Sequence, residues 1–167
     1  QPISLDALLP QEMAHKAEAI GVTKANFGPR RLLVLGMLAG AFIALGAVFA
    51  TTVATGSAAL PYGVARLLVG LVFSLGLILV IVGGAELFTG NNLIVMAWAS
   101  GRITTRKLLR NWLYVYIGNF IGALGTAILV FLSGQYHQAG GAVGVTMLNI
   151  SAGKVALPWL GALVLGI

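Results

Sequence analysis

The chain has 167 residues, of which 59% are apolar and only 8% are charged, and its formal net charge is +6. Charged residues make up about a quarter of a typical soluble domain, so this composition excludes a soluble protein and predicts an all-α integral membrane protein. The chain has no cysteine, and its two histidines, His15 and His137, lie outside the apolar segments. Disulfides and thiolate chemistry are therefore excluded, and we expect no metal and no cofactor.

Residues 1–31 are expected to be a cytoplasmic lead-in that contains one amphipathic surface helix. Pro10 suits a first helical position, Gly21 suits the stop, and apolar residues between Met13 and Ile20 share one face. The simpler interpretation is a helix that packs on the membrane domain, and a gating or partner-binding element is the alternative. No short apolar region ends in a cleavage site, so a signal peptide is not expected.

Residues 32–167 are predicted to form the membrane domain, since a helix needs about 20 apolar residues to cross a bilayer. We expect a first span at about 32–55, a second that starts at 64, a third at about 107–132, an outer loop at 134–153 and the start of a fourth span at 154–167. The fourth segment is too short to cross. Because the chain also begins without methionine, we expect it to be a fragment of a longer protein.

The sequence GGAELFTGNN interrupts the second span at residues 83–92. The stretch 61–101 is too long for one helix and too short for two helices with a connection outside the membrane. A single broken helix is therefore predicted, with a first half at 64–82, a loop at 83–92 and a second half at 93–100. Irregular backbone at membrane depth is tolerated only where it is buried in protein or lines a cavity, so we expect the break to line a pathway.

Basic residues cluster beside the apolar segments and indicate the orientation. One cluster precedes the first span and the other lies between the second and third spans, and together they comprise Lys16, Lys24, Arg30, Arg31, Arg102, Arg106, Lys107 and Arg110. The positive-inside rule places both clusters, and with them the N-terminus, in the cytoplasm. Because this rule accounts for the basic residues, no nucleic-acid partner is expected.

Several residues of the break are candidates for holding the loop in place. Asn91 or Asn92 can cap the second half-helix, whose positive end would then attract anions; alternatively, both asparagines only satisfy loop backbone. Glu86, the only acid in the apolar region, can accept loop amide hydrogen bonds, and a proton relay is the alternative role. The expected loop scaffold comprises Glu86, Gly83, Gly84, Gly90, Asn91 and Asn92.

Other residues are candidates for a substrate pathway. The Thr89 hydroxyl can donate to an anion at a narrow point. Leu87, Phe88, Phe73 and Leu77 can form apolar constrictions, although such residues are more often ordinary packing. Lys154 stands at the outer end of the fourth segment, where it can concentrate anions or act as an interfacial anchor.

Two GxxxG pairs, Gly36 with Gly40 and Gly118 with Gly122, allow close helix approach within or between subunits. Asn119, beside the second pair, is expected to make an interhelical hydrogen bond rather than to contact a solute. The sequence shows no phosphate-binding loop, no nucleophile with its base and no metal cluster, so an enzyme is not expected.

Three stretches together resemble the formate/nitrite transporter family: LPYGVARLLVGLVFSLGLILVIVGG, AELFTGNNLIVMAWASGRIT and RNWLYVYIGNFIGAL. The resemblance extends from about Leu8 to the end of the chain. It implies a homopentamer of aquaporin-like protomers, each with its own pore and six spans in two inverted halves, of which this chain resembles the first half. It also implies that the second span is broken by an omega-shaped loop.

By the same resemblance, Thr89 corresponds to a loop threonine that approaches a pore histidine of the second half. Phe73, Leu77, Leu87 and Phe88 correspond to the hydrophobic constrictions or their surroundings, and Lys154 to a lysine near the outer vestibule. The implied mechanism draws a small monovalent anion into a basic vestibule, protonates it and passes the neutral acid through an apolar barrier, which avoids the cost of moving a charge.

The expected function is therefore proton-linked passage of formate, then of nitrite or hydrosulfide, in the inner membrane of a bacterium. Gly90 stands where the formate channels of the family have serine, which leaves the choice among these anions open. One alternative is an aquaporin-like channel for neutral solutes, which would be expected to carry paired NPA tripeptides, and none occurs. Another alternative is a non-transporting membrane scaffold, which would need no broken helix.

Overall fold

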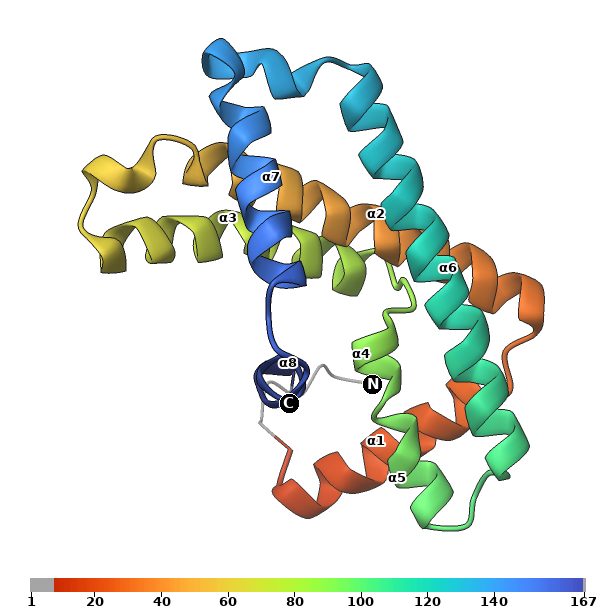
Figure 1. Ribbon diagram of the computed structural model, residues 1–167. Coiled ribbons are helices and arrows are strands. Elements are labelled where there is room, and N and C mark those ends of the chain that lie inside the picture. Colours follow the sequence, from red (N-terminus) through yellow and green to blue (C-terminus); the bar gives the residue numbers. More distant parts are fainter. Residues whose placement is uncertain (1–7, 167) are drawn as a thin grey trace. The chain divides into compact units, whose positions relative to one another are not determined.

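The computed structural model describes residues 8–166 and shows helices with no strand in that range. Figure 1 shows the elements, which are α1 Pro10–Ala25, α2 Pro29–Ala54, η1 Ser57–Ala59, α3 Tyr62–Val82, α4 Phe88–Asn91, α5 Ile94–Ala99, α6 Thr105–Leu132, η2 Gln135–Gly141, α7 Ala142–Val155 and α8 Trp159–Gly166. By length and composition, α2, α3 and α6 can each cross a membrane. The stretch from η2 through α7 and the following α8 are bent by 103° and make a fourth candidate if they form one span.

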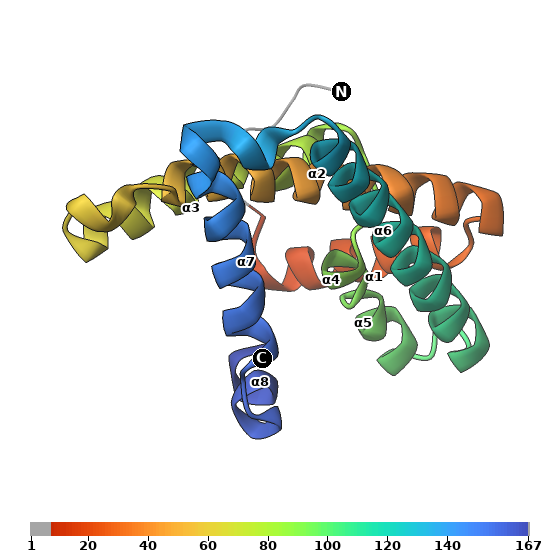
Figure 2. The same ribbon diagram turned by 45° about the horizontal axis from the view of Figure 1, so that its top comes forward.

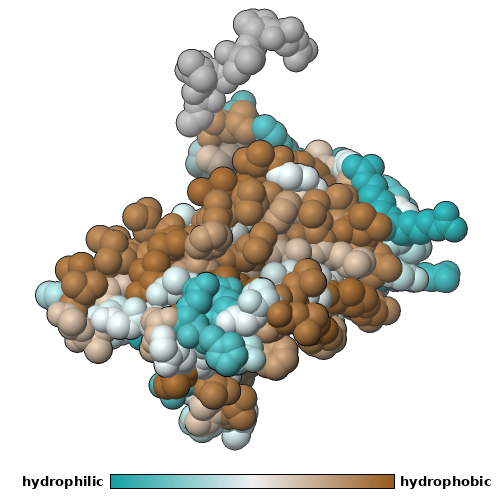
Figure 3. All heavy atoms as spheres, turned by 90° about the horizontal axis from the view of Figure 1, so that it is seen from above, coloured by the Kyte–Doolittle hydropathy of each residue, from teal (hydrophilic) through white to brown (hydrophobic). Residues whose placement is uncertain are grey.

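The surface of these helices is largely apolar. Figure 3 shows hydrophobic side chains over most of the visible face and hydrophilic side chains in separate patches. Large apolar residues such as Leu67, Leu71 and Phe120 are exposed. In water such a surface would be unfavourable, and a bilayer is the solvent that accommodates it. The all-helical membrane fold expected from composition is confirmed.

The chain divides into two compact units. The first unit contains the residues up to Ala41 together with Val80–Ala123, and the second contains Phe42–Leu79 together with the residues from Leu124 onward. The break in the second span therefore belongs to the first unit, with α1, α5 and the starting halves of α2 and α6.

The first unit contains a small apolar core where α1 meets α5 and α6. Ala25, Ile94, Ala97, Ile103 and Leu108 are buried there, with Val22 and Trp112 packed against them. Figure 2 shows α1, α4 and α5 close together beside the starting half of α6. The N-terminal helix thus packs against the residues that follow the break instead of forming a separate domain.

The expectation that Gly21 ends the N-terminal helix is wrong, because α1 continues to Ala25. A Cβ at Gly21 would lie 3.1 Å from the Ala97 Cβ and 3.5 Å from the Ile94 Cα. Glycine at this position therefore permits close contact between α1 and α5 and does not act as a helix stop.

Within the first unit, the two GxxxG pairs face each other across the α2–α6 crossing. A Cβ at Gly36 would lie 3.1 Å from the Val115 carbonyl oxygen, and one at Gly118 would lie 2.7 Å from the Leu33 carbonyl oxygen. At Gly122 a Cβ would overlap the Met37 carbonyl oxygen. The glycine pairs therefore bring two spans of one chain into backbone contact, as small residues do in membrane helices.

In the second unit, the structure corrects the expected outer loop at 134–153. Gly134, Gly140 and Gly141 adopt positive φ angles of 73°, 65° and 89°, and the short helix η2 lies among them. From Ala142 the chain is helical as far as Val155. The glycines that mark the turn precede α7, and apolar residues such as Val143 and Met147 follow them and sustain the helix.

The start of the fourth segment is corrected in the same way. Lys154 lies in the last turn of α7, not at the beginning of a new span. The next helix, α8, starts at Trp159, directly after Pro158. Proline disfavours helical geometry in the preceding residue and has no amide hydrogen to donate, so the bend falls there and not at Lys154.

Candidate functional site

The second span is broken between Val82 and Ile94, as predicted. Helix α3 ends at Val82, residues 83–87 are not helical, the single turn α4 follows, and α5 begins at Ile94. Gly84 has a φ of 60°, which favours glycine. The Ala85 amide donates to the Val80 carbonyl at 3.0 Å, and the Glu86 amide donates to the Leu35 carbonyl of α2 at 3.1 Å. These two amides of the break are therefore paired inside the protein, as membrane depth requires.

Glu86 is buried at the centre of a polar network in the first unit. Its side chain is 4% exposed, and Oε1 lies 3.0 Å from the Lys24 Nζ of α1. Its Oε2 accepts a hydrogen bond from the Asn91 Nδ2 at 2.8 Å. The carboxylate thus accepts from side chains rather than from the loop amides that we expected. Because a buried carboxylate is costly without partners, Lys24 and Asn91 stabilise the position of the loop.

Asn91 is fully buried and connects three elements. Besides its bond to Glu86, its Nδ2 donates to the Asn111 Oδ1 of α6 at 2.9 Å, and its Oδ1 accepts from the Lys24 Nζ at 3.2 Å. Its carbonyl accepts from the Trp112 Nε1 at 3.0 Å. The side chain is therefore engaged inside the network and does not cap the second half-helix.

The expected cap of the second half-helix is wrong for both asparagines. The residue at the N-cap of α5 is Leu93, and no side chain caps the helix. Asn92 is the C-cap residue of α4 and is exposed. Their positions follow from the extra turn α4, which shifts the start of α5 past both residues.

Asn119 fixes the other end of the loop. Its Nδ2 donates to the Gly36 carbonyl of α2 and to the Glu86 carbonyl of the loop, both at 2.9 Å. Its Oδ1 accepts from the Phe88 amide at 2.8 Å. An asparagine side chain has two donors and one acceptor oxygen, and here all of them are used. The expected interhelical bond is present, and the same side chain also holds the loop.

The Phe88 ring is held by aromatic residues of α6. Its centroid lies 5.5 Å from that of Tyr116 and 6.3 Å from that of Trp112, with both pairs in edge-to-face geometry. Edge-to-face contact is one of the two arrangements that aromatic rings favour. Phe88 and Leu87 are half-buried, so both are partly accessible beside the anchored backbone.

Thr89 is exposed on α4. Within residues 8–166 its hydroxyl makes no hydrogen bond to another residue, which separates it from the buried polar groups around it. Gly90 follows it, and a Cβ at that position would have no described heavy atom within 4 Å; Gly83 and Gly84 are also exposed. One side of the loop is therefore bound to α1, α2 and α6, and the side that carries Thr89 is open.

The remaining predicted pathway residues belong to the second unit. Phe73 and Leu77 are exposed on α3, four residues apart and thus on one helix face. Lys154 is exposed in α7, and within the described range it makes no ion pair.

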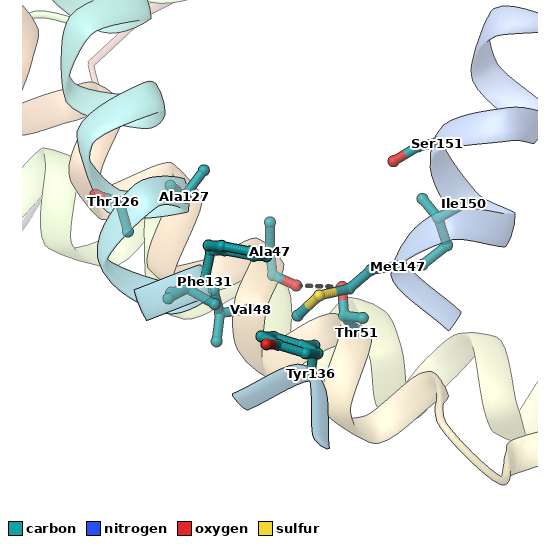
Figure 4. A pocket seen from close by; sticks show the side chains of 12 residues that line it. Ala47, Val48, Thr51, Thr126, Ala127, Phe131, Tyr136, Met147, Ile150 and Ser151 are labelled. Carbon is teal, nitrogen blue, oxygen red and sulfur yellow. Dashed lines mark hydrogen bonds between the residues drawn. The ribbon is translucent and has the colours of Figure 1, made fainter. Parts of the chain in front are cut away.

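A cavity of about 430 Å³ lies in the second unit between α2, α6, η2 and α7. Figure 4 shows its mostly apolar lining, with Met147 and Ile150 of α7 across from Ala47 and Val48 of α2. Neither Phe73, Leu77 nor Lys154 lines it. The cavity therefore contains none of the residues that the sequence predicts for the pathway in this unit.

Four network residues are not predicted as site residues from the sequence. Lys24 belongs to the cytoplasmic basic cluster and Asn119 to helix packing, and the sequence indicates no site role for Trp112 or Asn111. One signal is present: Asn111 and Asn119 are eight residues apart, which places two amides on the same face of one helix. Amides on an otherwise apolar span need partners, so this spacing is informative.

A carboxylate of the N-terminal helix makes a further contact that depends on pH. Glu18 of α1 accepts a hydrogen bond from the Ser100 Oγ, and the Arg102 Nη1 lies 3.5 Å from its Oε2. The Ser100 hydrogen bond, and then the nearby Arg102, hold the pKa of Glu18 below its ordinary value. The contact therefore contributes stability above the ordinary glutamate pKa, and this contribution is lost as the pH falls through the lowered pKa.

We expect acidification to loosen the contact of α1 with α5, but only slightly because Glu18 lies at the surface. The measured quantity is the hydrogen-exchange rate of the α1 amides in the wild type, divided by the rate in Glu18→Gln at the same pH. This ratio should rise at most several-fold as the pH falls below about 4. Comparison of the two proteins at each pH cancels the intrinsic pH dependence of exchange. An unchanged ratio across the acidic range would contradict the assignment.

The fold and the break define a class: a helical membrane protein whose second span is interrupted by a buried, hydrogen-bonded loop. The family model described as "Formate/nitrite transporter" matches residues 11–167. The chain belongs to the formate/nitrite transporter family.

Relatives and solved structures agree with this assignment. "Formate channel FocA" of Escherichia coli (strain K12) is 48% identical over 162 residues, which cover 97% of this chain and 57% of that protein. "Formate channel FocA" of Haemophilus influenzae is 45% identical, and the match covers 100% of this chain and 59% of that protein. A solved structure described as "Pentameric formate channel with formate bound" has a TM-score of 0.73 at 37% identity, covering 92% of this chain and 54% of the other. This chain thus spans somewhat more than half the length of these relatives.

Proposed function

We propose that this chain forms part of a transmembrane channel for small monovalent anions, with formate as the first candidate and nitrite or hydrosulfide as the next. The observation that carries the proposal is the exposed Thr89 hydroxyl, on a loop whose buried polar groups are engaged by α1, α2 and α6. A free hydroxyl beside two half-buried apolar residues suits a solute that needs one hydrogen bond and little water. The names of the relatives, which are formate channels, support the same substrate class.

In the proposed mechanism, Leu87 and Phe88 contribute an apolar constriction and Thr89 donates to the solute. A bare anion is costly in such surroundings, so the solute accepts a proton and crosses as the neutral acid. Phe73 and Leu77 contribute a second constriction, and Lys154 attracts anions toward an outer vestibule. Glu86, Gly83, Gly84, Gly90, Asn91 and Asn92 form the scaffold of the loop, and Glu86 acts through its ion pair, not as a proton relay.

We further propose a homopentamer in a bacterial inner membrane with the N-terminus in the cytoplasm. The solved relative is described as pentameric, and the relatives at 45–48% identity are bacterial. The orientation rests on the basic residues at the starts of α2 and α6. The proposed activity is transport, not catalysis. A neutral-solute channel and a non-transporting scaffold have no support among the relatives.

Replacement of Thr89 by alanine is expected to lower formate flux about tenfold, because one hydrogen bond to a polar or charged solute is lost. Flux into proteoliposomes that contain the full-length protein measures this effect, with nitrite, hydrosulfide and glycerol as parallel solutes. Thr89→Ser keeps the hydroxyl and should retain most of the flux. Glycerol flux alone, or equal formate flux through Thr89→Ala, would refute the proposed pathway.

A further inference from the structure

Five cationic side chains gather where α2 and α6 begin: Arg30, Arg31, Arg106, Lys107 and Arg110. The carboxylates of residues 8–166 are engaged elsewhere. Glu12 accepts from the Leu9 amide, Glu18 contacts Ser100 and Arg102, and Glu86 pairs with Lys24. Within the described chain, this cluster therefore carries a charge of +5 that no acidic side chain balances.

Three cations of α2 and α6 contact the turn between α1 and α2. The Arg110 Nη2 donates to the carbonyls of Ala25 and Phe27 at 2.9 and 3.1 Å. The Lys107 Nζ donates to the Asn26 Oδ1 at 2.6 Å, and the Arg31 Cζ lies 3.7 Å from the centroid of the Phe27 ring. Lys107 and Arg110 from α6 and Arg31 from α2 thus meet at residues 25–28.

Two members of the cluster, Arg30 and Arg106, are exposed and have no such contact within residues 8–166. Arg106 precedes Arg110 by one helical turn and so lies on the same side of α6. Arg30 lies in the first turn of α2, two residues after the turn at residues 25–28. The guanidinium groups of both are therefore free to bind an anion.

Exposed apolar residues continue from each of these two arginines toward the middle of the span. Helical spacing places Val34 and Leu38 on the same face of α2 as Arg30, further along the span. It places Leu109 and Leu113 in the same way relative to Arg106 on α6. All four are exposed in the described structure, Val34 by 62% and Leu113 by 58%. Charge at the helix start followed by apolar surface matches a molecule with an anionic head and hydrocarbon chains.

We propose that the starts of α2 and α6 bind the headgroup of an anionic phospholipid. The cations lie where two membrane-crossing helices begin, which is the depth of lipid phosphates rather than of bulk water. Arginine binds phosphate oxygens through paired N–H donors, and the apolar residues below it accommodate acyl chains. The bound lipid supplies the negative charge that the protein lacks at this surface.

Native mass spectrometry of the full-length protein in detergent tests the proposal, with phosphatidylglycerol or phosphatidylcholine added at equal concentrations. We expect preferential retention of phosphatidylglycerol. The double variant Arg30→Gln/Arg106→Gln should weaken this retention on the order of 25-fold, about fivefold for each charge. Neither side chain has an intramolecular partner in the described structure, so the variant should melt at the wild-type temperature.

The matched control is Lys16→Gln/Arg66→Gln, which removes two exposed cations that lie outside the cluster and should leave retention unchanged. A further arm adds inorganic phosphate, which should not displace the lipid at millimolar concentration. Equal retention of the two lipids, equal losses in the two double variants, or displacement by phosphate would each overturn the proposal.

Discussion

Gly122→Ala is expected to prevent stable folding of the full-length protein. The added methyl group would overlap the Met37 carbonyl oxygen, which belongs to the backbone of α2 and cannot rotate away. Relief requires the two spans to separate along the whole crossing, where Gly36 and Gly118 are also in backbone contact. Overpacking typically costs about 1–3 kcal/mol, and backbone displacement along two spans places this variant at or above the upper end. Thermal melting in detergent and the yield of monodisperse oligomer measure the loss.

Gly125→Ala is the matched control for this variant. Gly125 lies three residues further along α6, and a Cβ there would have no described heavy atom within 4 Å. Alanine is also the better helix former, by up to about 1 kcal/mol. We therefore expect Gly125→Ala to melt at the wild-type temperature or slightly above it. Similar melting of the two variants would show that the α2–α6 contact is not the determinant.

Lys24→Met is expected to destabilise the protein by roughly 3 kcal/mol or more, because it leaves the buried Glu86 carboxylate without its cation. Methionine fills similar volume, so the loss comes from charge and not from a cavity. Formate flux should fall as well, since Glu86, Asn91 and the backbone of α4 belong to one network. Thermal melting and proteoliposome flux of the same preparation give both values.

The double variant Lys24→Met/Glu86→Gln should recover much of the lost stability. Glutamine is neutral, and its side-chain oxygen can still accept from the Asn91 Nδ2. A double-mutant cycle then isolates the coupling between the two positions. If the loss of stability in the double variant equals the sum of the losses in the two single variants, the coupling energy of the ion pair is zero.

Composition and local spacing were sufficient to predict the membrane fold and the broken second span. Lipid offers no hydrogen bonds, so spans must be continuous apolar helices, and an interruption such as GGAELFTGNN is conspicuous. The partners of the loop could not be predicted in the same way. Lys24 and Asn91 are 67 positions apart, and Glu86 and Asn119 are 33 apart. Such contacts depend on how helices rotate and pack, which periodicity alone does not determine.

Glycines led to a wrong prediction in two places, because a glycine can have more than one structural role. Glycines at 134, 140 and 141 do form a turn, but the residues after them are helical. Gly21 lies inside α1 and permits contact with Ala97. The sequence shows where a glycine lies. Only the structure shows whether that glycine allows a turn with positive φ or a close contact between two helices.

The loop of the broken span has one face whose bonds specify its shape and another face that carries Thr89 and Gly90. A side chain introduced at Gly90 meets no described atom within 4 Å, and Thr89 holds no bond of the network. Changes at these two positions therefore leave the hydrogen bonds of Glu86, Asn91 and Asn119 intact. Such a division lets natural variation or engineering change the side chains of this face while the bonds that specify the shape of the loop stay in place, which makes this surface an evolvable part of the molecule.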